Sequence, residues 1–244
     1  MKVTPEVLAD LAPQGVLRTA INLGNPVLAQ RRPDGQPAGV SVALAKALAE
    51  RLGVSLDMAT YDAAGKVFAD LENHAWNLAF LAIEPVRAAQ IEFSHPYVII
   101  EGTYLLRNSD PAQSVAELDQ RGRRIAVGQG AAYDLYLSRT LAQAELLRAP
   151  TSAAAVDWFV DQSLDAAAGV RQPLEAYARE HLGYRVLPDS FTEIRQAMAV
   201  PKGRLAGAAF VRCFLDKQIR NGFVADALRQ SGQLEARVGP PLAD

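Results

Sequence analysis

The six-residue run Leu78-Ala79-Phe80-Leu81-Ala82-Ile83 constrains the fold of this chain more than any other stretch. It has no polar position that would face water, which is typical of a strand covered on both sides. Such strands belong to parallel sheets, because each crossover between neighbouring parallel strands needs a connection long enough for a helix. The run therefore predicts a parallel sheet with helices on both faces.

The residues before this run alternate between strand and helix patterns. Leu44, Leu48 and Leu52 repeat at helical spacing, and Gly53 ends the predicted helix. The predicted elements up to residue 83 are strands at 16–22, 54–59 and 78–83 and helices at 44–52 and 67–71. This βαβαβ order again indicates a parallel sheet.

The same alternation begins again after residue 107. The predicted elements are strands at 124–127, 145–148, 164–168 and 184–187 and helices at 131–142, 151–160 and 173–181. Two extended segments, Thr103–Arg107 and Ala197–Val200, are expected to cross between the halves. We therefore expect two lobes, each with a central mostly parallel sheet flanked by helices. Residues 1–106 with 200–244 form lobe 1, and residues 107–199 form lobe 2.

Composition excludes several classes of function. The formal net charge is -2 with both signs spread along the chain, unlike the concentrated basic surface of a nucleic-acid binder. Cys213 is the only cysteine, so there is no internal disulfide, and its apolar neighbours predict a buried thiol. No stretch approaches the roughly 20 apolar residues of a membrane span. We expect a monomer that needs no cofactor and no metal.

The first residues lack the apolar run and the small-residue cleavage site of a secretory leader. Thr4 instead predicts a helix N-cap with Pro5 at the first helical position. As the sequence stands it predicts a cytoplasmic chain, and a periplasmic one if a leader has been removed.

The segment Glu84-Pro85-Val86-Arg87 is the first candidate site. It follows the buried strand at Ala82, and Pro85 suits the start of a helix, where free N–H groups favour an anion. A guanidinium binds a carboxylate through two parallel hydrogen bonds. The alternative is an exposed Arg87 paired with a nearby glutamate.

Two further strand ends carry candidate residues. Gly128-Gln129-Gly130-Ala131-Ala132-Tyr133 begins like a dinucleotide-binding fingerprint, but Tyr133 stands where the third glycine is needed. A turn that offers N–H groups to a small anion and a plain turn both remain open. After the strand at 164–168, Arg171 either holds an anionic group or forms a surface salt bridge. In open parallel sheets ligands bind beyond the carboxyl ends of strands, so the site is expected in the cleft between the lobes.

Three motifs in order resemble one family. Residues 39–53 look like G-F-D-V-D-L-A-x-x-I-A-x-x-L-G, Glu84–Arg87 looks like T-P-E-R, and Ile91–Tyr97 looks like V-D-F-S-x-P-Y. Over about residues 16 to 235 the chain resembles the family 3 extracellular solute-binding proteins, the polar amino-acid receptors of ABC importers. The resemblance implies the type II periplasmic-binding fold, with lobe closure around a two-strand hinge and a permease as partner.

The resemblance also implies roles for individual residues. Arg87 would hold the ligand α-carboxylate, helped by the N–H groups of Ala131 and Ala132 after Gly130. The acidic residue that holds the α-ammonium in the family is replaced here by Val170. The departures from the family pattern that remain are Asn25, near the position of a first-loop aromatic, and Lys66, at a usually small or polar position.

These features predict a non-catalytic protein that binds a small anionic carboxylate: an oxo or hydroxy acid, a dicarboxylate or an amino-acid-like compound. Because Val170 removes the ammonium partner and Arg171 and Lys66 add possible cations, acids without an α-ammonium, or with a second acidic group, are expected to be preferred. Glu84 keeps a zwitterionic amino acid open. The alternatives are a dehydratase, with Glu101, Glu175 or Glu193 as general acid, and a cytoplasmic ligand sensor.

Overall fold

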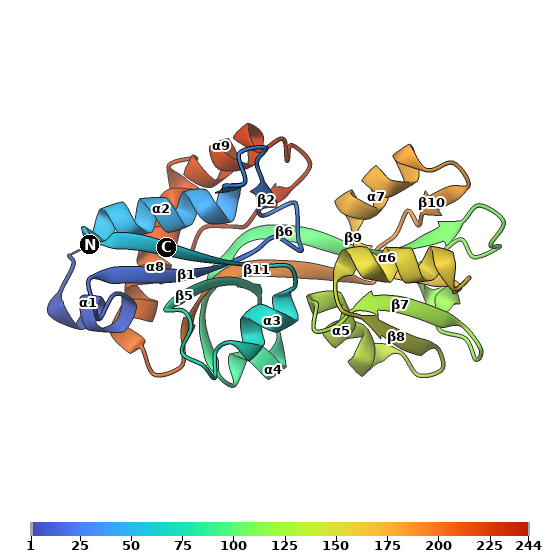
Figure 1. Ribbon diagram of the computed structural model, residues 1–244, viewed down its shortest axis with the longest axis horizontal. Coiled ribbons are helices and arrows are strands. Elements are labelled where there is room, and N and C mark those ends of the chain that lie inside the picture. Colours follow the sequence, from blue (N-terminus) through green and yellow to red (C-terminus); the bar gives the residue numbers. More distant parts are fainter. Residues whose placement is uncertain (1, 244) are drawn as a thin grey trace. The chain divides into compact units, whose positions relative to one another are not determined.

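The computed structural model describes residues 2–243, and the chain divides into two compact units (Figure 1). Unit 1 comprises the residues up to 62, residues 66–99 and the residues from 195 onward, and unit 2 comprises residues 63–65 and 100–194. The chain leaves unit 1 within β6 (Ile91–Arg107) and returns within β11 (Thr192–Pro201). The predicted boundaries, after residues 106 and 199, lie further along each of these strands. Both strands are continuous, so their sequence pattern does not indicate where to divide them.

Three parallel strands form the centre of the unit 1 sheet. β1 (Val16–Asn22) pairs in parallel with β4 (Ser55–Tyr61) on one side and with β5 (Leu78–Ala82) on the other. β11 follows β5 in antiparallel orientation. All five residues of β5 are buried, as the apolar run predicts. The predicted βαβαβ unit is confirmed.

Helices surround this sheet in the described part of the chain. They are α1 (Pro5–Leu11), α2 (Val40–Leu52), α3 (Ala64–Ala69), α4 (Pro85–Ala88), α8 (Leu205–Arg220) and α9 (Phe223–Gln230). Thr4 caps α1 as predicted, because its hydroxyl accepts the N–H of Val7. α2 packs on β1, β4 and α9. Three two-residue strands complete the unit: β2 (Gln30–Arg31), β3 (Pro37–Ala38) and β12 (Arg237–Val238).

Unit 2 repeats the strand order of unit 1. Its central strand β7 (Arg124–Gly128) pairs in parallel with β8 (Glu145–Ala149) and β9 (Ala166–Val170). β9 and β10 (Tyr184–Val186) both pair with β6 in antiparallel orientation. The helices are α5 (Ala132–Thr140), α6 (Ser152–Asp161) and α7 (Arg171–Glu180), preceded by a 3₁₀ turn at Val115–Leu118.

Small residues let the helices of unit 2 approach the sheet closely. Phe159 of α6 is fully buried among alanines from β7, β8 and β9. Its ring also lies under the guanidinium of Arg107, which donates hydrogen bonds to the carbonyls of Phe159 and Leu164. One large side chain thus fills the space that the small ones leave.

Cys213 is exposed, so the prediction of a buried thiol is wrong. It lies in α8, where Phe210, Val211 and Phe214 are buried while Cys213 faces away from them. An apolar run in a helix cannot bury all its members, because only one stripe of the helix meets the core. None of the helices over residues 2–243 is long and apolar enough to cross a membrane.

Both ring nitrogens of His95 are buried in the folded chain. It lies in β6, and within residues 2–243 neither of its buried ring nitrogens has a hydrogen-bond partner. Burial lowers the pKa of His95 below its ordinary value of 6.5, and the nearby Asp216 carboxylate opposes this shift. The unfolded chain therefore takes up a proton at this position before the folded chain does.

We expect acidification to destabilise the chain through His95. Because its pKa is lower in the folded state, stability is lost as the pH falls through the ordinary histidine range, from about pH 8 to about pH 5. His95→Phe should flatten this part of the profile of melting temperature against pH. His74→Asn is the matched control, because His74 is exposed and asparagine tolerates its positive φ of 52°. An unchanged profile in His95→Phe would contradict the assignment.

Candidate functional site

The unit 1 candidates follow the carboxyl ends of two adjacent strands. β1 and β5 are parallel neighbours, so the loop after β1, with Asn25, and the segment after β5, with Glu84 and Arg87, lie at the same edge of the sheet. Glu84 is the N-cap of α4, and Pro85 is its first residue. This is the edge at which open parallel sheets bind ligands.

The Arg87 guanidinium is buried, which excludes the alternative of an exposed arginine. Only 1% of Arg87 is exposed, and its Nη1 donates to the carbonyl of Ala82 over 3.1 Å. Burial lowers the pKa of Arg87 to about 10, while the Glu84 carboxylate raises it. Arg87 therefore stays charged at neutral pH. Glu84 is itself 8% exposed, so unit 1 holds a buried cation and a buried anion at one strand end.

Asn25 and Lys66 are both engaged locally. The side-chain oxygen of Asn25 accepts the N–H of Val27, and its carbonyl accepts the N–H groups of Leu28 and Ala29, so Asn25 shapes the loop in which it lies. Lys66 is exposed and forms an ion pair with Asp62 at 2.7 Å. Lys66 is therefore a partnered cation.

The unit 2 turn between β7 and α5 uses its own N–H groups in succession. Gly128 donates to the Tyr133 hydroxyl over 3.3 Å, Gln129 to the carbonyl of Ala149 over 2.8 Å, and Gly130 to Oδ2 of Asp134 over 2.8 Å. Ala131 then donates to the carbonyl of Gly128 over 3.1 Å. The N–H of Ala131 already has an acceptor within the turn. The first N–H groups that lack an acceptor within the helix are therefore those of the first turn of α5, starting at Ala132.

The glycines of this turn are required by geometry. Gly130 has φ +70°, and a Cβ on Gly128 would lie 2.8 Å from the Tyr133 hydroxyl. Tyr133 is buried, donates to Oγ of Ser152 over 2.7 Å, and has its pKa raised by burial. A buried tyrosine therefore stands at the position where a dinucleotide fingerprint needs a glycine for close helix–strand packing.

Asp134 and Arg148 are two residues that sequence reasoning missed. Asp134 is 3% exposed, and its Oδ1 accepts from Nε of Arg148 over 3.0 Å while its Oδ2 accepts from Gly130. Arg148 also donates to Oγ of Ser138. An acidic residue in the first turn of α5 is a usual helix-start signal, so only its burial separates it from an ordinary exposed one.

Arg171 is engaged within unit 2. It follows Val170, the N-cap of α7, and pairs with Glu101 at 2.6 Å and with Glu175 at 3.6 Å. It also donates to the carbonyls of Leu187, Pro188 and Asp189. The structure thus shows the salt bridge, and a role of Arg171 in holding an anionic group stays a prediction. Val170 is half-buried, and its side chain offers no acceptor for an ammonium.

The three residues proposed as general acids differ in their surroundings. Glu101 and Glu175 are both held by Arg171, and Glu193 is an exposed residue of β11. Over residues 2–243 no group of three or more histidine, cysteine, aspartate or glutamate side chains is placed to hold a metal ion.

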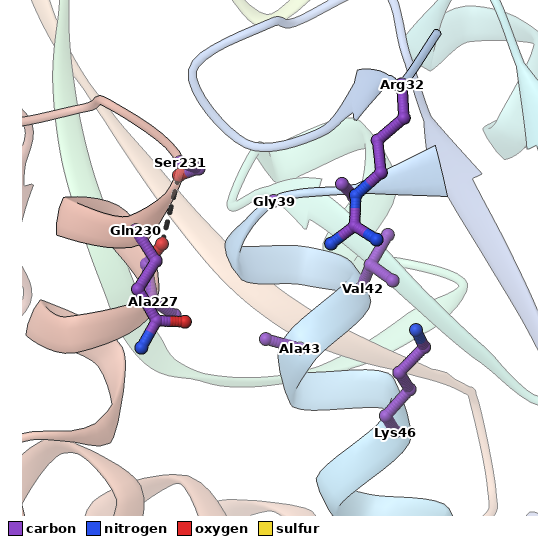
Figure 2. A pocket seen from close by; sticks show the side chains of 9 residues that line it. Arg32, Gly39, Val42, Ala43, Lys46, Ala227, Gln230 and Ser231 are labelled. Atoms are coloured by element: carbon purple, nitrogen blue, oxygen red, sulfur yellow. Dashed lines mark hydrogen bonds between the residues drawn. The ribbon is translucent and has the colours of Figure 1, made fainter. Parts of the chain in front are cut away.

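Figure 2 shows a pocket of about 220 Å³ in unit 1 that none of the predicted site residues lines. Arg32 and Lys46 lie on one side of α2 and both reach toward Val42, while Gln230 and Ser231 approach from α9. The pocket lies beside the first turns of α2, and neither Glu84 nor Arg87 is among its lining residues. It is therefore not the site that the sequence predicts.

The chain is thus a two-unit α/β protein with a buried cation and a buried anion after a strand of unit 1. The family model described as bacterial extracellular solute-binding proteins, family 3, matches residues 17–231. The chain belongs to this family. No curated protein matches the sequence at the significance required of a relative.

Solved structures share the fold. The cysteine-binding protein from Campylobacter jejuni superimposes with a TM-score of 0.81 at 18% identity, covering 96% of this chain and 99% of its own. An amino acid ABC transporter substrate-binding protein from Streptococcus pneumoniae, bound to L-arginine, gives 0.79 at 20% identity, covering 92% and 97%. An ancestral amino acid-binding protein, a precursor of cyclohexadienyl dehydratase, gives 0.77 at 23% identity, covering 91% and 98%. These likenesses confirm the predicted type II periplasmic-binding architecture.

We expect Arg171→Met to destabilise unit 2, because the substitution removes the hydrogen bonds to the carbonyls of Leu187, Pro188 and Asp189 and the ion pair with Glu101. The loss of unfolding free energy should be about 1–3 kcal/mol, measured by urea unfolding. Arg179→Met is the matched control, since Arg179 is an exposed arginine of the same helix. A ligand-binding role for Arg171 would instead weaken binding while leaving the urea midpoint unchanged.

Proposed function

We propose that this chain is a non-catalytic receptor for an α-amino acid or a close analogue. The observation that carries the proposal is the pairing of a buried cation, Arg87, with a buried anion, Glu84, at one strand end. A zwitterion complements both charges, with its carboxylate on Arg87 and its ammonium on Glu84. An acid without an amine would complement only one of them and would face the Glu84 carboxylate.

This proposal departs from the preference for amine-free acids that the sequence predicts. That preference depended on Val170 and on two extra cations, and both cations have partners: Lys66 with Asp62, and Arg171 with Glu101. Without them the balance of charge favours a ligand that carries both signs. In this proposal Glu84 binds the ligand α-ammonium, which is the role of an acidic residue at the Val170 position in the family.

Within unit 2, the first turn of α5 offers N–H groups to an anion in this proposal. The first turn of α5 begins at Ala132, and the preceding N–H groups are used within the turn. The amino acid-binding and L-arginine-bound proteins that share the fold support a ligand of this kind. Lobe closure on the ligand, delivery to an ABC permease and the compartment in which this happens remain predictions from the family.

A dehydratase is the second candidate, because one protein that shares the fold is described as a precursor of cyclohexadienyl dehydratase. The engagement of Glu101 and Glu175 by Arg171 speaks against it, since neither is free to act as a general acid. Release of product during incubation with a cyclic carboxylate would favour the enzyme.

Replacing Arg87 should weaken amino-acid binding by ~2–4 kcal/mol, because a buried charge-assisted pair loses one partner. The measurement is calorimetry with the twenty L-amino acids against Arg87→Ala. Arg87→Lys keeps the charge but loses the two-pronged geometry, so it should also bind weakly if the guanidinium grips the carboxylate. Arg212→Ala, at an exposed position of α8, is the matched control. Full affinity in Arg87→Lys and Arg87→Ala would exclude the carboxylate role.

Glu84→Gln tests the ammonium contact separately. Glutamine keeps the shape but not the charge, so the affinity for the best amino acid should fall about tenfold or more. The matching acid without its α-ammonium should bind no worse than to the wild type, since it no longer faces a carboxylate. Glu50→Gln, at an exposed position of α2, serves as the control. Equal loss for both ligands would mean that Glu84 supports the fold and not the ammonium.

A further inference from the structure

We propose that the pocket of unit 1 shown in Figure 2 is a second binding site, one that takes a small anion with a phosphate group. Two of its lining residues, Arg32 and Lys46, are cations, and no acidic residue of the described chain lines it. The chain as a whole has a formal net charge of -2, so this gathering of positive charge runs against the overall balance. The inference does not depend on the proposed function, because neither Glu84 nor Arg87 lines the pocket.

The two cations converge without an anion to hold them. Arg32, after β2, and Lys46, on α2, both extend toward Val42 (Figure 2). In the part of the chain that the structure describes, neither side chain takes part in a hydrogen bond or an ion pair. Lys66 and Arg171, by contrast, have carboxylate partners. Cations that approach each other repel, and an anion bound between them attracts both, so a ligand would supply the missing counter-charge.

Hydrogen bonds fix the backbone at both cations. The N–H of Arg32 donates to the carbonyl of Gln36 over 2.9 Å, and its carbonyl accepts the N–H of Gly35 over 2.9 Å. Lys46 lies in the middle of α2, about one turn after Val42. Binding an anion therefore requires only the ordering of two side chains, which keeps the entropic cost of binding low.

The helix ends beside the pocket support the same reading. Gly39 lines the pocket and is the N-cap of α2, so no side chain caps the positive end of this helix. The end of α9 carries partial negative charge, but the carbonyls of Ala227 and Leu228 already accept from the N–H and the hydroxyl of Ser231. The amide of Gln230, which has no side-chain partner among the described residues, can donate to the same ligand.

A phosphate group complements this arrangement better than a carboxylate does. It carries about -1.5 to -2 charges at neutral pH and three acceptor oxygens, enough to meet both cations at once. A guanidinium binds phosphate through two parallel hydrogen bonds, and an ammonium binds it as a point charge. The pocket of about 220 Å³ is several times the roughly 30 Å³ that one water molecule takes up in the liquid. Both inorganic phosphate and a small phosphate ester are therefore within its size.

Calorimetry with inorganic phosphate, glycerol 3-phosphate and succinate tests the site. Both phosphates, or the ester alone, should bind, and succinate should bind at least about tenfold more weakly. Arg32→Gln and Lys46→Gln should each weaken phosphate binding about tenfold, because each removes one cation from the pocket. Both positions are exposed, so both variants should keep the melting temperature of the wild type. The matched control for the double variant is Arg212→Gln/Lys217→Gln, which removes two positive charges from exposed positions of α8 in the same unit.

Binding of both phosphates would show that the phosphate group is sufficient, and binding of the ester alone would show that the ligand is a phosphate ester. No saturable binding of either phosphate, equal affinity for succinate, or an equal loss in the α8 control would overturn the proposal. Loss of phosphate binding in Arg87→Lys, with full affinity in Arg32→Gln/Lys46→Gln, would also overturn it, because the phosphate would then bind after β5. A wild type that binds phosphate but no amino acid would support this inference while the proposed function fails.

Discussion

The burial of one guanidinium organises the candidate site in unit 1. Moving a charge out of water costs several kcal/mol unless it is paired and hydrogen-bonded. Arg87 meets this requirement through the carbonyl of Ala82, the last residue of β5, and through the Glu84 carboxylate. α4 has four residues, too few to be stable by itself. The position of α4 therefore depends on the interactions of Arg87 with Ala82 and Glu84.

The repeated strand order explains why the candidate residues gather where they do. In each unit the central strand is the first of three parallel strands, with the second and third on either side of it. The loops after β1 and β5, and those after β7 and β9, therefore meet at one edge of their own sheet. This much follows from the sequence, because apolar runs and helical spacing report burial and period within a single segment.

What the sequence could not reveal are partners far apart along the chain. Arg171 next to Val170 looked like an additional cation for a ligand, yet its carbonyl acceptors lie at Leu187–Asp189 and its carboxylate partner is Glu101. Likewise the glycine turn at Gly128–Gly130 was predictable as a turn. Which of its N–H groups remain for a ligand was not, because one acceptor comes from β8 and two from side chains of α5. Local pattern predicts backbone shape, whereas hydrogen-bond accounting needs the tertiary fold.

Each unit pairs a buried charged side chain with one of opposite sign. In unit 1 a buried cation lies with a buried anion, and in unit 2 the buried Asp134 carboxylate lies with Arg148. Neither pair carries a net charge that would attract an anion at long range, so in the proposed function selection depends on where individual charges and N–H groups point. In the proposed function, a ligand must match both the cation and the anion of unit 1. That demand describes an α-amino acid better than it describes a simple carboxylate, because only the amino acid presents an opposite charge to both residues.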